Sequence, residues 1–240
     1  IQKLKEINPD FLVTFAFGQI LSQEVLDIPK FSTINLHASL LPKYRGANPI
    51  QRCIYNGDCE TGITTMITVL ELDAGDICKI DKIQITENMN DVELKDIISQ
   101  KSPDLICTTL KELYDGKLVP KKQDENGITI AKKFNKEDGL IDWTKTALEI
   151  HNQVRSMLDF PTAYTYFNSK MIKIIETEIV DFKEQSRNAE ITAVSKLGIV
   201  VTTKKGSILI KKVKPESKGI MNAFDFANGA KIKAGMKFGE

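Results

Sequence analysis

The chain has 240 residues, of which 42% are hydrophobic and 27% are charged, and its formal net charge is +1. Such a composition is typical of a folded protein with a buried core and excludes a disordered chain. No stretch approaches the roughly 20 consecutive apolar residues that span a bilayer, and the length suits one large domain or two small ones.

The cysteine and histidine content argues against a metal site. The chain has only two histidines, and no two of its four cysteines form a CxxC pair. Zinc sites need cysteines and histidines that lie closer together in the sequence, or more of them, than this chain has. We therefore expect no bound metal and a reducing, cytoplasmic setting. The cysteines are Cys53, Cys59, Cys78 and Cys107.

The near-neutral total charge hides an asymmetry along the chain. Residues 1–116 carry 11 basic and 17 acidic side chains, whereas residues 186–240 carry 11 basic and only 4 acidic ones. A cationic end on a neutral protein indicates a polyanionic partner that meets one part of the molecule. A lysine-rich face that is merely solvated explains the same charges equally well, so charge alone leaves both interpretations open.

The first half of the chain predicts alternating strands and helices. An apolar run at 11–17, a short helix at 22–26 and a strand at 32–37 have the spacing of a βαβ unit, which predicts a parallel sheet. A helix begins near Pro49, because proline is favoured in a first turn. The strands and the long helix expected next lie at 62–70, 77–85 and 92–114, with the helix interrupted at Ser102-Pro103.

The second half of the chain has a different pattern. Residues 117–135 are basic and broken by proline and glycine, which predicts a linker. A helix at 144–157, capped by Thr144, follows. Short strands separated by turn residues then favour a small β-barrel or sandwich. These strands are expected at 164–167, 171–180, 191–194, 198–203 and 207–213.

Three polar side chains are candidates for chemistry. Asn35 and His37 lie two residues apart at the end of a predicted strand, so their side chains point to the same face. Open α/β sheets place their sites at the carboxyl ends of parallel strands. Asp73 lies in a turn farther along the chain. Each residue also has an ordinary explanation, since a histidine near a strand end is often a structural residue and an aspartate before Ala-Gly often forms a turn.

The segment around these residues resembles a known family. Asn35-Leu-His37, Ser39-Leu-Leu-Pro42 and Leu72-Asp-Ala-Gly-Asp76 occur in the order found in folate-dependent formyltransferases. Within that family, Arg45-Gly-Ala-Asn-Pro-Ile-Gln51 and Glu137-Asp-Gly-Leu-Ile-Asp-Trp143 are most similar to the members that formylate methionyl-tRNA. The resemblance runs along essentially all 240 residues.

The resemblance implies a fold and a reaction. The fold is α/β: a Rossmann-like formyltransferase domain over 1–116, the linker over 117–135, and a C-terminal helix with a small OB-like β-barrel over 136–240 that binds tRNA. Members of the family begin with further strand–helix units, so the chain is expected to be an N-terminally incomplete fragment. The implied reaction moves a formyl group from the co-substrate 10-formyltetrahydrofolate to the amino group of initiator methionyl-tRNA, for the start of translation. A monomer that does not bind membranes is expected.

The resemblance also assigns roles to residues. Asn35 and His37 would donate hydrogen bonds to the oxyanion that forms at the formyl carbon, and Asp73 would act with His37 or hold a water that removes the amine proton. The folate pocket would contain Gln19, Ile20, Leu21, Ser39, Leu40, Leu41, Pro42, Leu70, Glu71 and Leu72. The tRNA contacts would be Arg45, Lys204, Lys205, Lys211, Lys212 and Lys214. Core packing explains Ile20 and Leu21 equally well, and a solvated loop position explains Arg45.

Two other functions stay open. The acceptor could be water or a small amine, such as a sugar nucleotide or glycinamide ribonucleotide, although a nucleotide-sugar enzyme does not require a lysine-rich C-terminal domain. The chain could also be a truncated remnant that binds RNA without catalysis. Salt-sensitive tRNA binding would favour an RNA acceptor or partner, because contacts to phosphates weaken as ionic strength rises.

Overall fold

A computed structural model describes residues 1–180 and 187–239 of the chain. They form two compact units. Unit 1 comprises residues 1–53, 58–86 and 93–133, and unit 2 comprises residues 54–57, 87–92 and 134–240. Among the described residues, no helix combines the length and apolar character needed to cross a bilayer.

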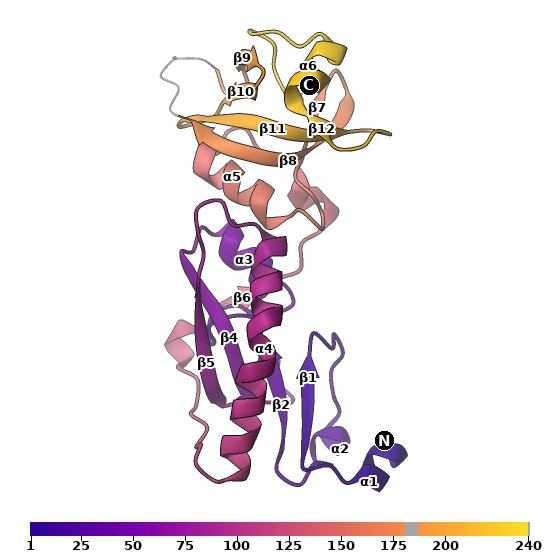
Figure 1. Cartoon of the computed structure of the whole chain (residues 1–240), viewed down its shortest axis with the longest axis vertical. Helices are drawn as coiled ribbons and strands as arrows, with labels where there is room; N and C mark the ends of the chain where they lie inside the picture. The colour runs from indigo at the N-terminus through magenta and orange to yellow at the C-terminus, as the bar shows by residue number, and fades with distance from the viewer. Residues whose placement is uncertain (181–186, 240) are drawn as a thin grey trace. The chain divides into compact units, whose positions relative to one another are not determined.

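Unit 1 contains a four-stranded sheet in the order β1-β2-β4-β5 (Figure 1). The strands are β1 (Phe11–Phe15), β2 (Ser32–His37), β4 (Glu60–Ile67) and β5 (Ile77–Gln84). Only β1 and β2 are parallel, whereas β4 runs antiparallel to both of its neighbours. The fully parallel sheet expected from the sequence is therefore wrong beyond β2. The physical reason is clearest for β4 and β5, because residues 68–76 join them without a crossover helix, and such short connections suit antiparallel strands.

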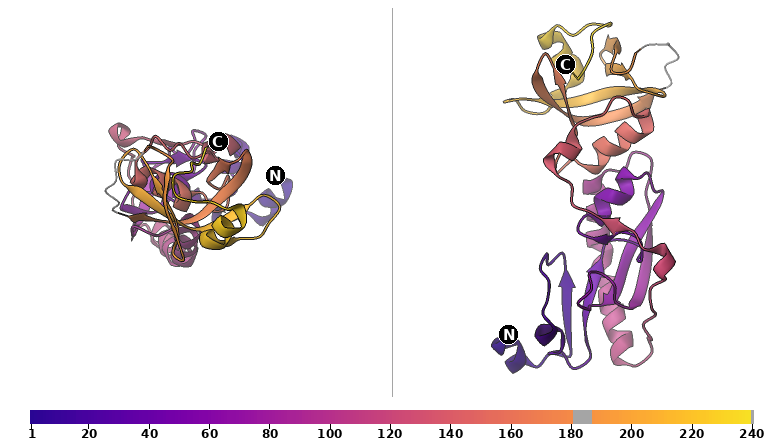
Figure 2. Two further views of the ribbon diagram at one scale, coloured as in Figure 1. Left: turned by 90° about the horizontal axis from the view of Figure 1, so that it is seen from above. Right: turned by 180° about the vertical axis from the view of Figure 1, so that it is seen from behind.

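One long helix covers one face of this sheet (Figures 1 and 2). Helix α4 runs without a break from Asp91 to Tyr114, although Pro103 lies inside it. The interruption predicted at Ser102-Pro103 is thus wrong. The proline removes one backbone donor, but the buried side chains of Leu94 and Ile98 hold the helix against unit 1. The other helices of this half are α1 (Gln2–Ile7), α2 (Gln23–Leu26) and α3 (Pro49–Tyr55).

Two short segments of unit 1 form a separate two-stranded sheet. Strand β3 (Arg45–Gly46) pairs in parallel with β6 (Ile130–Ala131), beyond the short 3-10 helix Glu125–Gly127. Lys121 also exchanges backbone hydrogen bonds with Ile77. The expected linker over 117–135 is therefore part of unit 1 as far as residue 133, because its backbone is paired with the unit rather than solvated.

Unit 2 contains an antiparallel sheet in the order β7-β8-β11-β10-β9, with β12 paired to β11. The strands are β7 (Tyr164–Phe167), β8 (Lys170–Val180), β9 (Ile191–Ser195), β10 (Gly198–Thr202), β11 (Ser207–Pro215) and β12 (Met221–Asn222). Within the described ranges, no strand pairing joins β7 to β9. The expected OB-like barrel is therefore not confirmed, and the described sheet is open.

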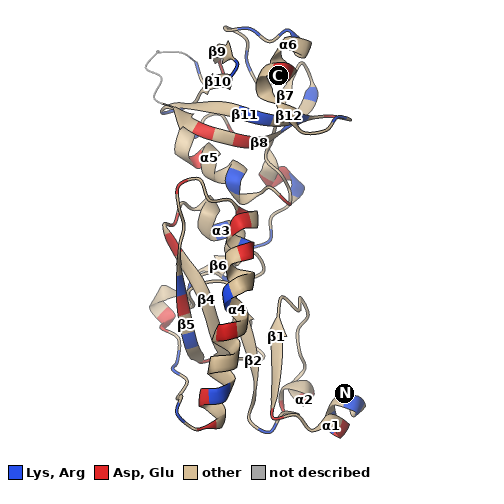
Figure 3. Ribbon diagram, in the orientation of Figure 1, with Lys and Arg blue, Asp and Glu red and all other residues tan. Residues whose placement is uncertain are grey.

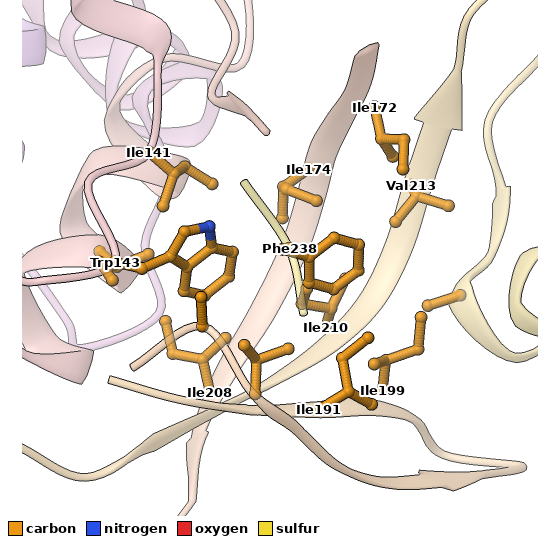
Figure 4. Packing of buried hydrophobic residues seen from close by; sticks show 14 of the residues in the cluster. Ile141, Trp143, Ile172, Ile174, Ile191, Ile199, Ile208, Ile210, Val213 and Phe238 are labelled. Atoms are coloured by element: carbon orange, nitrogen blue, oxygen red, sulfur yellow. The ribbon is translucent and has the colours of Figure 1, made fainter. Parts of the chain in front are cut away.

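The helices of unit 2 pack around an isoleucine-rich core. They are the 3-10 helix Lys136–Gly139, α5 (Ala147–Ser156) and α6 (Ala223–Ala230). The sequence did not predict α6 or strand β12. Trp143 and Phe238 stack at 5.8 Å between ring centres and lie among isoleucines of β8, β9, β10 and β11 (Figure 4). Helix α5 begins after Thr146, whose hydroxyl accepts the Glu149 N–H, so the predicted cap at Thr144 is wrong.

Candidate active site

Asn35 and His37 lie on the same face of β2, as their spacing predicts. Thr14 of β1 stands opposite Asn35 in the register, and its hydroxyl donates a 2.8 Å hydrogen bond to Asn35 Oδ1. This bond uses the carbonyl end of the Asn35 side chain and turns its two N–H groups away from Thr14. Asn35 is half-buried, so these N–H groups are available as donors on that face.

The imidazole of His37 lies between a backbone carbonyl and a carboxylate. Its Nε2 lies 2.8 Å from the carbonyl oxygen of Tyr44, and its Nδ1 lies 3.6 Å from Asp73 Oδ2. Because a carbonyl oxygen only accepts, Nε2 carries a hydrogen and donates it to Tyr44. This leaves Nδ1, on the Asp73 side, as the ring atom that can gain or lose a proton. The ring is 5% exposed, so water screens this pair weakly.

Asp73 reaches this position from a tightly constrained turn. Its backbone has φ +49°, the left-handed region that costs a side-chain-bearing residue about 1–2 kcal/mol. Two residues later, a Cβ at Gly75 would overlap with the carbonyl oxygen of Ile67, so the turn lies directly against the end of β4. Asp73 Oδ2 accepts a 2.8 Å hydrogen bond from the backbone N–H of Gly46. The same carboxylate oxygen thus faces a backbone donor and His37.

The loop after β2 is fixed to the sheet by one threonine. The hydroxyl of Thr64 on β4 donates to the carbonyl of Ser39 at 2.7 Å and accepts from the N–H of Leu41 at 3.2 Å. These bonds fold the loop back across the face that carries His37. The carbonyl of Tyr44 is thereby placed against the imidazole ring.

The site supplies the groups that acyl transfer between amines requires. A neutral carboxamide donor, an imidazole and a partly buried carboxylate occupy one region of unit 1. Such groups can stabilise an oxyanion and move a proton from an attacking amine to a leaving nitrogen. His37 and Asp73 are in direct contact, while Asn35 stands one step along β2 on the face of His37.

Comparison with known proteins decides the family. Residues 1–110 match the formyl transferase family, and residues 133–231 match the formyl transferase C-terminal domain. A methionyl-tRNA formyltransferase of Clostridium acetobutylicum is 44% identical over 236 residues, which is 98% of this chain and 76% of the relative. One of Fusobacterium nucleatum is 40% identical over 239 residues, covering 99% and 77% of the two chains. The chain belongs to the methionyl-tRNA formyltransferase family.

Solved structures share the fold of this formyltransferase chain. HypX from Aquifex aeolicus in complex with tetrahydrofolic acid aligns with a TM-score of 0.73 at 16% identity, over 97% of this chain and 41% of HypX. The methionyl-tRNA formyltransferase from Clostridium thermocellum aligns with a TM-score of 0.58 at 22% identity, over 75% and 76% of the two chains. At these identities the alignments show the fold alone.

The residues expected to bind folate in this formyltransferase fall into two groups. Ile20, Leu70 and Leu72 are 86%, 58% and 60% exposed, so they are not core residues. Ser39 and Leu41 are buried and hold the loop after β2. Folate binding by all ten residues stays a prediction. Of the remaining five, Gln19 and Glu71 are exposed, and Leu21, Leu40 and Pro42 are half-buried.

The residues expected to bind tRNA also differ in environment. Arg45 is only 6% exposed, and its guanidinium binds Gln123 and Glu71, so it is not a solvated loop residue. Lys211 and Lys212 form ion pairs with Glu176 of the neighbouring strand β8. Figure 3 shows acidic positions on β8 beside basic positions on β11. The other three, Lys204, Lys205 and Lys214, are exposed. All six tRNA contacts stay predictions.

Hydrogen bonding to Lys212 lowers the pKa of the Glu176 carboxyl, and hydrogen bonding to Glu176 raises the pKa of Lys211. These opposite shifts show that the paired lysines already have a local counter-charge.

Two further residues contribute to this site without any recognisable signal in the sequence. Gln123 lies in the predicted linker, yet it donates to the carbonyl oxygens of Asp73 and Gly75. Thr129 accepts the Tyr44 N–H with its hydroxyl and the Arg45 N–H with its carbonyl. No local pattern marks either residue, because both act on segments about 50 or more positions away in the chain.

Proposed function

We infer that this chain transfers a formyl group from 10-formyltetrahydrofolate to the free amino group of initiator methionyl-tRNA. The observation that carries this inference is the contact of His37 with Asp73 on the face of β2 that presents Asn35. This arrangement lies in a chain that is 44% identical to a methionyl-tRNA formyltransferase over 98% of its length.

The transfer requires one bond to form and one to break at the formyl carbon. The amine nitrogen of the methionyl group attacks that carbon, and the carbonyl oxygen becomes an oxyanion. The Asn35 carboxamide and a protonated His37 Nδ1 donate hydrogen bonds to this oxyanion, which is the largest stabilisation that such sites provide. The carbon–nitrogen bond to the folate then breaks. His37 Nδ1 gives its proton to the departing folate nitrogen, and Asp73 takes the proton lost by the amine. That proton then passes from Asp73 to Nδ1, which restores the protonated ring.

Exposed apolar side chains support a folate site in unit 1. Ile20, Leu70 and Leu72 are large, apolar and more than half exposed, and Leu72 directly precedes Asp73. Exposed apolar groups beside polar catalytic groups are typical of ligand sites, because the ligand covers them. A flat pterin ring that packs on these side chains would bring its formyl group towards His37.

Unit 2 supplies a route for tRNA recognition. Lys204 and Lys205 are exposed in the turn between β10 and β11, and Lys214 is exposed on β11. Exposed lysines contact nucleic-acid phosphates and raise affinity without reading sequence. A monomer in the reducing cytoplasm suits this role, and all four cysteines are free thiols.

Acceptor competition tests the proposed function. The chain is mixed with labelled 10-formyltetrahydrofolate and with methionyl-tRNA, a nucleotide-linked amino sugar or glycinamide ribonucleotide. We expect methionyl-tRNA to exceed the small amines in kcat/KM by on the order of 100-fold or more, because only tRNA also engages unit 2. Faster transfer to a small amine would overturn the choice of acceptor. Salt-sensitive tRNA binding without formyl transfer would instead favour a non-catalytic RNA-binding protein.

A further inference from the structure

Gln123 connects the arginine of β3 to the turn that carries Asp73. Its Nε2 lies 2.8 Å from the carbonyl oxygen of Asp73 and 2.8 Å from that of Gly75. Its Oε1 accepts from Nε and Nη2 of Arg45 at 3.0 and 2.9 Å. The side chain therefore uses both of its N–H groups and both lone pairs of its oxygen.

These partners admit only one type of side chain. Arg45 can only donate and the two carbonyl oxygens can only accept, so the residue between them must present an acceptor on one side and two donors on the other. A glutamate at position 123 would bind Arg45 but turn a carboxylate oxygen towards the two carbonyls. A methionine would fill the same volume and satisfy neither side. The side-chain amide of Gln123 is thus chemically matched to both neighbours.

The turn held by Gln123 needs external support. Asp73 has a left-handed backbone, and its own carbonyl is one of the two that Gln123 binds. Residues in such conformations persist where the surrounding structure over-determines them. Gly75 lies against Ile67 on one side, and Gln123 holds its carbonyl on another.

Gln123 is itself fixed on both sides along the chain. Two residues earlier, Lys121 exchanges backbone hydrogen bonds of 2.8 and 2.7 Å with Ile77, just beyond the Asp73 turn. Seven residues later, β6 begins its pairing with β3, which carries Arg45 and Gly46. Backbone hydrogen bonds therefore fix the chain on both sides of Gln123, to the Asp73 turn on one side and to β3 on the other.

We propose that Gln123 is a positioning residue for catalysis: it fixes the Asp73 turn so that the carboxylate meets both His37 and the Gly46 amide. This role rests on the proposed function, in which Asp73 and His37 move the proton. Gln123 acts through Asp73, and no contact with the substrates is required. A misplacement of about 1 Å in a reacting group can lower a rate by about 100-fold, which sets the size of the expected effect.

Hydrogen exchange at one backbone amide tests the geometry without turnover. The Gly46 N–H donates to Asp73, whereas the flanking amides of Arg45 and Ala47 donate to carbonyls of residues 129 and 131. We expect Gln123→Met and Gln123→Glu to accelerate exchange at Gly46 by at least tenfold, with little change at its two neighbours. Gln84→Met is the matched control, because Gln84 is an exposed glutamine that binds Glu60 on β4. Unchanged Gly46 exchange in Gln123→Met would overturn the proposal.

Kinetics of the full chain test whether Gln123 acts through Asp73. Gln123→Met is expected to lower kcat about 10- to 100-fold with KM for both substrates within about twofold. In an Asp73→Asn background, Gln123→Met should lower kcat by a much smaller factor, because the carboxylate that Gln123 positions is already absent. An equal loss of kcat in both backgrounds would show a merely structural role and overturn the proposal.

The two readouts separate the two claims. If Gly46 exchange accelerates but the chain transfers no formyl group to methionyl-tRNA, the proposed function fails while the contact of Gln123 with the Asp73 turn stands. In that case the catalytic role of Gln123 is overturned along with the reaction. If the chain transfers the formyl group and Gln123→Met keeps full kcat, only the role of Gln123 fails.

Discussion

The hydroxyl of Thr14 decides which end of the Asn35 side chain faces the site. It donates to Asn35 Oδ1 at 2.8 Å, so the two N–H groups of the amide point elsewhere. Without that donor, the amide can rotate by half a turn and present its oxygen where a developing oxyanion needs a donor. The orientation of a catalytic donor here depends on a residue of the neighbouring strand.

We therefore predict that Thr14→Val lowers kcat about tenfold and leaves stability nearly unchanged, because valine suits a strand and has a similar shape. Thr33→Val is the matched control, since Thr33 lies on β2 and its buried hydroxyl has no hydrogen-bond partner among the described residues. Steady-state kinetics and urea unfolding of both variants measure the two effects. Equal rates for the two variants would argue against an orienting role for Thr14.

At the scale of elements, the cap of α5 distinguishes the structure from the sequence prediction. Thr146 accepts the Glu149 N–H, and the Glu149 carboxylate accepts the Thr146 N–H at 2.8 Å. The Thr146 hydroxyl also donates to the Glu149 carboxylate at 2.7 Å, and this bond, followed by that of the Thr146 N–H, lowers the pKa of the Glu149 carboxyl. The sequence placed the cap at Thr144, which instead donates its hydroxyl to Asp142.

Thr146→Ala is predicted to destabilise unit 2 by about 1 kcal/mol, the usual cost of losing an N-cap. Thr144→Ala is the comparison, and we expect it to cost less than half as much. Urea denaturation curves of the two variants give the free energies of unfolding. A larger loss of unfolding free energy in Thr144→Ala would instead support Thr144 as the N-cap of α5, as predicted from the sequence.

The buried face of α5 also predicts a dependence of stability on pH. Burial lowers the pKa of His151 from its ordinary value of 6.5, and the nearby Arg155 lowers it further, against opposing contributions from Glu87 and Glu178. The ring contacts the Thr177 hydroxyl and the Glu87 carbonyl. The neutral ring is therefore favoured in the folded state, and below about pH 6.5 the unfolded chain binds more protons than the folded one.

The stabilising effect of this ring is fully present above about pH 6.5 and is lost as the pH falls towards the lowered folded value. We predict that the free energy of unfolding of the wild-type chain falls between pH 7.5 and 5.5. His151→Gln should show a smaller slope over that interval. Chemical denaturation at four or five pH values measures both slopes, and identical slopes would contradict the assignment.

At the scale of the whole molecule, local patterns predicted elements better than they predicted pairings. Strand β2 and the shared face of Asn35 and His37 followed from alternation along a few residues. The antiparallel direction of β4 could not be predicted from such local patterns, because it depends on contacts between distant segments. The contact of Asp73 with His37 was expected from the resemblance to the family and not from the residues alone. Gln123 could not be found, since nothing local separates it from a linker glutamine.

The distribution of paired and exposed lysines predicts how tRNA binding responds to salt. Lys204 and Lys205 are exposed, so their replacement by alanine should weaken binding and reduce the slope of log affinity against log salt by about 1 per lysine. The control removes an ion pair of unit 1 with no change in net charge, as Lys101→Ala with Asp81→Ala. We expect that control to keep the wild-type slope. A larger change in the control would place the phosphate contacts on unit 1.

The most direct test of the central claim is formyl transfer from 10-formyltetrahydrofolate to methionyl-tRNA by the wild-type chain and by His37→Ala, at saturating concentrations of both substrates. The account predicts transfer by the wild-type chain and a loss of about 100- to 1,000-fold in the variant, because an oxyanion donor and proton carrier is removed. Added imidazole should restore part of the lost rate. An unchanged rate in a folded His37→Ala chain, or no transfer by the wild-type chain, would contradict the account.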